Sequence, residues 1–218
     1  MLIRHRRMDW RARIADLPPE QRALLIGGSL SQRFTQGPLG LTHPALIGAF
    51  YGLIISVALA TPLGYQKDWA LDVWMQDWSY LALMLMLLMA VLGHISLIIA
   101  KVSKRPPVTL WRSLVFPMPF VGLILFTAAL VTDLNAVLPS ALAGLPIQIA
   151  WLLLLIPGPV YVQLSWAPRW RILCRLEDGL EPFEGRTAMQ PIEAEAPGDD
   201  ELERALDALE SPAFAEEE

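Results

Sequence analysis

The feature that most constrains this chain is a set of long apolar runs that carry no Asp, Glu, Lys or Arg. The first run, Ala45–Tyr65, also lacks histidine, and three more follow at 79–100, 113–132 and 141–166. A helix of about 20 apolar residues crosses a hydrocarbon core about 30 Å thick. Together with a hydrophobic content of 54%, these runs predict an all-α integral membrane protein with four transmembrane helices.

The basic residues predict the orientation of these spans. The first 44 residues hold seven arginines, the first link between spans holds only Lys67, the second link holds four bases and the third holds none. Arg169, Arg171 and Arg175 follow the last span. Cytoplasmic loops carry the excess of Lys and Arg. We therefore expect both termini in the cytoplasm and a multi-pass protein of a bacterial-type inner (plasma) membrane.

The regions outside the spans divide into three. Residues 1–44 predict cytoplasmic, basic amphipathic helices, because Ile3, Trp10, Ile14 and Leu17 share one helical stripe. Such helices lie on an anionic membrane surface, or alternatively pack as a cap on the helix bundle. Residues 167–198 are expected to be a juxtamembrane segment and linker, and 199–218 an acidic tail with a short helix.

The C-terminal region is strongly acidic. Residues 193–218 hold eleven acidic residues and one base. Within 199–210, Leu202, Leu206 and Leu209 share one helical face, which predicts a short helix that folds onto a cytoplasmic or peripheral protein. The alternative is a largely disordered, solubilising tail.

Small residues recur at every fourth position of the first run. They are Gly48, Gly52, Ser56, Ala60 and Gly64. This spacing places them on nearly the same helix face, where a second helix backbone can approach closely. We interpret the stripe as a helix-packing face, within the chain or against a partner subunit.

The sequence gives little support for catalysis. The four runs hold no charged side chain, whereas pumps and ion-coupled transporters usually keep such groups in their spans. A nucleophile with its base, a phosphate loop and a dinucleotide motif are also absent from plausible positions. With one cysteine, Cys174, there is no cysteine cluster for a metal. We expect a protein that is not an enzyme and has no metal site, no obligatory cofactor and no nucleic-acid partner.

Two histidines are the candidate cofactor residues. His94 is the one histidine inside a run, and His43 precedes the first run. The predicted topology places both on the cytoplasmic side, where imidazoles are able to ligate a haem or bound a quinone pocket. The alternative is that each is a neutral histidine hydrogen-bonded to a neighbouring helix.

Prolines mark a candidate gate in the third and fourth runs. The residues are Pro117, Pro119, Pro157, Gly158 and Pro159. Each proline removes a backbone donor and frees a carbonyl oxygen, so two broken stretches at similar depth predict a polar cytoplasmic vestibule. Kinks that only fit the helices together are the alternative.

Three functions follow from these features. The leading hypothesis is a non-catalytic accessory or scaffold subunit of an inner-membrane complex, which contacts lipid and other membrane subunits and recruits a further protein through its acidic tail. The second is a small transporter or channel gated at the prolines. The third is a haem- or quinone-binding subunit that uses His94.

Overall fold

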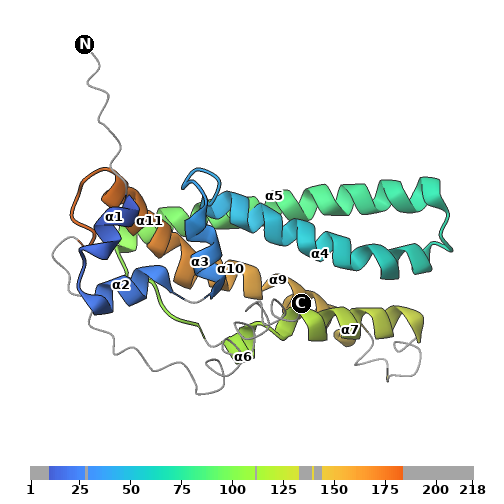
Figure 1. Cartoon of the computed structure of the whole chain (residues 1–218). Coiled ribbons are helices and arrows are strands. Elements are labelled where there is room, and N and C mark those ends of the chain that lie inside the picture. Colours follow the sequence, from blue (N-terminus) through green and yellow to red (C-terminus); the bar gives the residue numbers. More distant parts are fainter. Residues whose placement is uncertain (1–9, 28, 111, 133–138, 140–143, 184–218) are drawn as a thin grey trace, which may run out of the picture. The chain divides into compact units, whose positions relative to one another are not determined.

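The protein is described from a computed structural model, which covers residues 10–27, 29–110, 112–132, 139 and 144–183. Every regular element in these ranges is a helix (Figure 1). Three helices are long and apolar enough to cross a membrane: Pro44–Gln66, Leu71–Ser103 and Leu145–Glu177. The described residues therefore have the helical character that the sequence predicts, with three helices that could cross a membrane. The fourth span remains a prediction, because Met118–Val131 is a shorter apolar helix.

Helices α4 (Pro44–Gln66) and α5 (Leu71–Ser103) lie side by side (Figure 1). A methyl group added at Gly52 would lie 2.6 Å from the backbone oxygen of Leu85, and one at Gly48 would overlap that of Met89. Gly93 of α5 is equally close to Pro44. The two backbones touch only because these positions lack a side chain. The small-residue stripe of α4 is thus occupied within the chain.

Helix α5 begins eight residues before the predicted start of the second span. Trp74 and Trp78 lie on its first turns, and their indole N–H groups donate to the carbonyl oxygens of Ala60 and Ser56 at 3.0 and 2.7 Å. These bonds hold α5 against α4 beyond the apolar run. The turn between the helices places Trp69 at a positive φ of 56° and packs its ring on Gly64.

The third predicted span is divided at a proline. Helix α6 is Arg112–Val115, and α7 runs from Met118 to Val131 with Pro117 as its N-cap residue. Helix α7 pairs with α9 (Leu145–Leu155), where Gly122 faces the backbone oxygen of Ala150.

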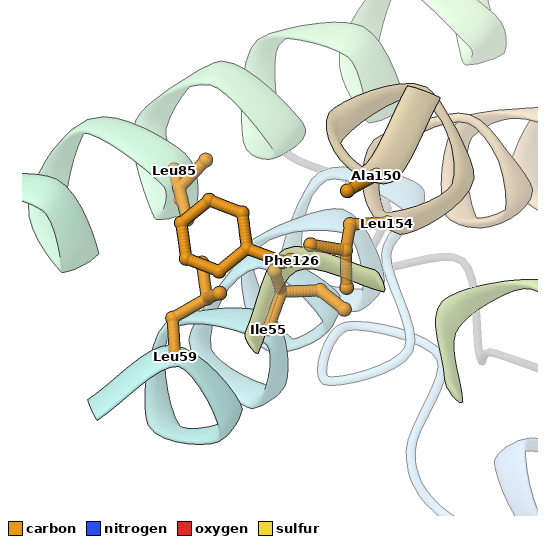
Figure 2. Close-up of a cluster of buried hydrophobic side chains, with 6 residues drawn as sticks. All are labelled: Ile55, Leu59, Leu85, Phe126, Ala150 and Leu154. Carbon is orange, nitrogen blue, oxygen red and sulfur yellow. The ribbon is translucent and has the colours of Figure 1, made fainter. Parts of the chain in front are cut away.

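A cluster of buried side chains joins the two helix pairs. Figure 2 shows its six members, which come from α4, α5, α7 and α9: Ile55, Leu59, Leu85, Phe126, Ala150 and Leu154. Fully burying one large aliphatic or aromatic side chain stabilises a fold by about 1.5–3 kcal/mol in water. Between two helices in lipid, the gain comes instead from close packing.

The last long helix changes its winding along its length. After α9 come α10 (Pro157–Tyr161), a π-helical turn η1 (Val162–Trp166) and α11 (Ala167–Glu177). Pro168 has no N–H to offer to the Leu164 carbonyl four residues earlier. The backbone N–H of Val108, in the link after α5, donates to that oxygen at 2.9 Å. Helix α11 ends at Glu177, which is eleven residues beyond the predicted end of the fourth span.

Three short helices precede α4. They are α1 (Trp10–Ala15), α2 (Pro19–Ile26) and α3 (Ser29–Gln36). Helix α2 ends at Gly27, whose φ of 62° and ψ of −164° belong to a region open to glycine. We call residues 10–27 and 29–43 the N-terminal collar. The predicted acidic tail, with Leu202, Leu206 and Leu209, lies outside the described residues.

Candidate functional site

The side chain of Arg169 connects the N-terminal collar to the last long helix. It is 1% exposed, although it follows the predicted fourth span by only three residues. Its Nε and Nη2 donate to the carbonyl oxygen of Leu24 at 3.2 and 3.1 Å. Its Nη1 donates to the hydroxyls of Ser31 and Ser165 at 2.8 and 3.1 Å. One guanidinium thus binds α2, α3 and the π-helical turn together.

Gly27 makes room for this guanidinium. A methyl group at Gly27 would lie 2.5 Å from Nη2 of Arg169. The hydroxyl of Tyr161 lies 3.0 Å from that of Ser31, which extends the polar cluster to α10. Every acceptor that the described residues supply to Arg169 is a neutral oxygen. The cost of burying the charge is therefore offset by hydrogen bonds rather than by an ion pair.

Other arginines bind the C-terminal ends of helices. The Nη2 of Arg11 donates to the backbone oxygens of Thr35, Gln36 and Gly37, at the end of α3. Arg22 donates to Ala15 at the end of α1, and Arg13 donates to Leu176 near the end of α11 at 2.7 Å. The last carbonyls of a helix lack intrahelical partners and carry partial negative charge, so a guanidinium is a favourable cap.

These contacts bear on the two interpretations of the basic N-terminal segment. Trp10 and Ile14 of the predicted stripe are 6% and 8% exposed, because the chain itself covers them. Helix α1 contacts α11 rather than projecting a free apolar face. Over the described residues, the geometry favours the cap that packs on the bundle. The expectation of a helix lying on the membrane surface does not fit Trp10 and Ile14.

Two tryptophans of the last helix fix the approach to α4. Trp166 is fully buried, donates from its indole N–H to the Thr42 carbonyl at 2.8 Å, and meets the ring of Phe34 edge-on at 5.0 Å. Trp170 donates to the Leu39 carbonyl at 2.9 Å. Indole rings supply large contact area together with one directional donor. The collar is thus held by hydrogen bonds at both ends of the turn that precedes α4.

His43 and His94, the predicted cofactor residues, lie together. Their ring centroids are 5.9 Å apart with an interplanar angle of 26°, and the ring of Trp170 meets His43 at 4.9 Å. Nδ1 of His43 accepts a hydrogen bond from the backbone N–H of Ala45 at 3.2 Å, which caps α4. Burial, followed by the nearby His94 and Lys101, lowers the pKa of His43 below 6.5. Haem or quinone ligation by this pair stays a prediction.

The predicted gate contains a packed joint. Gly158 lies against the ring of Tyr51, so closely that a methyl group there would overlap the ring. The Tyr51 hydroxyl donates to the Leu154 carbonyl at 2.7 Å and accepts from the backbone N–H of Gly158. It therefore occupies the place of a helical hydrogen bond between these two residues. Pro157 and Pro159 lie on either side of Gly158 in the sequence. Pro157 and Pro159 lack the N–H groups for the neighbouring bonds, so the helix is broken between α9 and α10.

The remaining candidate residues are placed as follows. Pro117 and Pro119 lie at the start of α7. Ser56 is fully buried in α4, and Ala60 is half-buried. The residues that the structure describes contain no group of three His, Cys, Asp or Glu side chains able to hold a metal ion.

Sequence reasoning overlooked Arg169 and Tyr51 as structural centres. Arg169 counted only toward the excess of positive charge after the fourth run. A signal was present, because Ser165 and Arg169 are four residues apart and therefore share a helix face. Tyr51 gave no comparable signal, since its partners are backbone groups more than a hundred residues away.

Over the described residues, the structure is a set of helices in which an N-terminal collar packs on helices long and apolar enough to cross a membrane. The chain matches no family model, no curated protein and no solved structure.

Proposed function

We propose that this chain is a non-catalytic accessory or scaffold subunit of a bacterial-type inner-membrane complex. The observation that carries the proposal is the collar, which Arg169, Trp166 and Trp170 fasten to the last long helix. They make five hydrogen bonds to four collar groups, and Arg169 makes a sixth to the π-helical turn. Ordered short helices at one end of the spanning helices provide a fixed surface on which a partner docks. The distribution of basic residues supports a cytoplasmic location for both termini.

The partner contacts are assigned to surfaces that the fold leaves free. Because Gly48 and Gly52 are used against α5, the small-residue stripe does not serve a partner. Helix α5 instead exposes a long apolar face toward lipid or other membrane subunits, with Leu83, Met84 and Leu87 each more than 60% exposed. The acidic tail recruits the cytoplasmic partner through its leucines, Leu202, Leu206 and Leu209.

Co-purification from a mild detergent tests the role of the tail. We expect a stoichiometric partner with the unchanged, affinity-tagged chain and its loss when Leu202, Leu206 and Leu209 are all replaced by serine. A matched control replaces Ala208, Ala213 and Ala215 by serine, which alters the same tail without removing its leucine face. Equal recovery of partner with both variants contradicts recruitment through the leucines.

The alternative function is transport through the proline-broken segments. The packing of Tyr51 against Gly158 makes this alternative less favourable. A gate at Pro157, Gly158 and Pro159 needs this joint to open, whereas Tyr51 bonds to both sides of it. Liposome flux that Pro157→Ala abolishes, with assembly intact, would replace the scaffold proposal.

A further inference from the structure

The region around His43 and His94 has polar groups without protein partners. In the described residues, Nδ1 of His43 accepts a hydrogen bond from the backbone N–H of Ala45. No hydrogen bond is found there for Nε2 of His43 or for either ring nitrogen of His94. His94 is exposed on a helix that crosses the apolar region. A polar group that faces hydrocarbon without a partner costs free energy. A ligand with matching polar atoms removes that cost.

The charge of the cluster indicates the kind of ligand. Lys101 lies two helical turns beyond His94 on the same side of α5, and it acts electrostatically on His43. The groups that act on His43 are therefore one lysine and a second imidazole, and none is a carboxylate. Three donors with one permanent positive charge favour an anionic oxygen ligand, such as a phosphate group.

The surroundings indicate that this phosphate carries hydrocarbon chains. The side chains next to His94 on the same exposed surface of α5 are apolar: Val91, Ile95 and Ile98 are 47%, 44% and 50% exposed. Trp170, whose ring contacts His43, is the kind of residue found at the boundary between headgroups and hydrocarbon. A water-soluble phosphate would leave the apolar surface uncovered, whereas a phospholipid covers both parts.

We propose that His43, His94 and Lys101 bind the phosphate of an anionic phospholipid, whose acyl chains lie along α5 beside Val91, Ile95 and Ile98. The site is independent of the proposed partner subunit, because it needs neither the tail nor a second protein. Basic groups between membrane helices commonly bind anionic headgroups in this way.

Native mass spectrometry of the full chain in detergent tests the site. The probes are phosphatidylglycerol and phosphatidylcholine with identical acyl chains. We expect one phosphatidylglycerol to be retained with at least about fivefold preference over phosphatidylcholine. This is the effect expected from roughly one lysine near an anionic headgroup. The double variant His94→Leu, Lys101→Gln should lose this preference. Arg105→Gln removes a positive charge four residues away and should keep it.

A further measurement separates a binding role from a structural one. Far-ultraviolet circular dichroism should be the same for both variants and the unchanged chain. Equal retention of the two lipids, or equal loss in the Arg105 control, overturns the site. Displacement of the lipid by equimolar glycerol 3-phosphate overturns the assignment of the phosphate to a lipid.

Discussion

At the scale of single residues, a tyrosine hydroxyl takes the place of one backbone hydrogen bond. The Tyr51 oxygen lies between the Leu154 carbonyl and the Gly158 N–H, which an uninterrupted helix would pair with each other. The ring has space only because position 158 is glycine. This joint fastens α4 to the segment between α9 and α10.

Tyr51→Phe should lower the free energy of unfolding by about 1–3 kcal/mol, because two backbone groups lose their partner in a half-buried site. Thermal unfolding in one detergent, followed by near-ultraviolet circular dichroism, measures the change. Tyr65→Phe is the matched control, since Tyr65 is exposed on the same helix. An equal effect of the two substitutions would show that the Tyr51 hydroxyl does not stabilise this joint.

His43 gives the fold a predicted dependence on pH. Its Nδ1 accepts the Ala45 N–H only while it is unprotonated. The pKa of His43 is below its ordinary value of 6.5, chiefly because of burial. The unfolded chain therefore takes up this proton first as the pH falls. The contribution of His43 is complete above pH 6.5 and is lost as the pH falls from 6.5 through the pKa of the folded state.

His43→Asn should remove this part of the pH dependence, because an asparagine oxygen also caps a helix and does not titrate. Chemical unfolding of both proteins between pH 8 and 5, in a zwitterionic detergent without anionic lipid, compares them. We expect the stability difference between the two to change only below about pH 6.5. Parallel curves over the whole range would mean that the cap does not titrate.

At the scale of elements, the collar depends on the contact of Arg169 with α2 and α3. Arg169→Lys keeps the charge but loses the planar fork that reaches three acceptors. Gly27→Ala places a methyl group against the guanidinium and at a φ of 62° that side chains disfavour. Each change should destabilise the collar by about 1–3 kcal/mol.

Hydrogen–deuterium exchange, read by mass spectrometry, locates the effect. Both variants should exchange faster in α2 and α3, with α4 and α5 unchanged. Arg33→Gln, an exposed arginine of the same collar, is the control and should leave exchange as it was. Faster exchange throughout the chain would mean that the collar and the spans unfold as one unit.

The elements that the sequence predicted well are those that their own local residues specify, without long-range contacts. The uncharged run at 45–65 coincides with α4 to within one residue, because apolar length alone specifies a spanning helix. Helix α5 begins at Leu71, before the predicted second span, and its first turns include Asp72 and Asp77. In the structure, Trp74 and Trp78 bind to carbonyls of α4, and no local pattern reveals that long-range pairing.

The candidate site was predictable only in part. The rings of His43 and His94 are 5.9 Å apart, and their cytoplasmic location stays a prediction. The internal use of Arg11, Arg13 and Arg169 was not predictable, since an arginine in a basic segment looks the same whether it faces lipid or caps a helix. Which helix ends lie near each arginine depends on the tertiary arrangement.

At the scale of the whole molecule, the number and direction of the spans remain predictions. A protein with Cys174→Ser and a single new cysteine tests them through labelling of intact cells with a membrane-impermeant maleimide. We expect labelling at Lys67→Cys and Asn135→Cys, and protection at Lys104→Cys and Ser211→Cys. Protection at position 135 as well would mean that Met118–Val131 does not cross the membrane.

The most direct test of the scaffold proposal is the native mass of the particle extracted gently from its own membrane. We expect a defined assembly that contains one or more copies of the 24.3 kDa chain together with at least one other protein. Its mass should equal the sum of these components. The same preparation, treated to dissociate subunits, should release both components in a fixed ratio. A particle that contains only one or several copies of this chain, with bound lipid alone, would contradict the proposal.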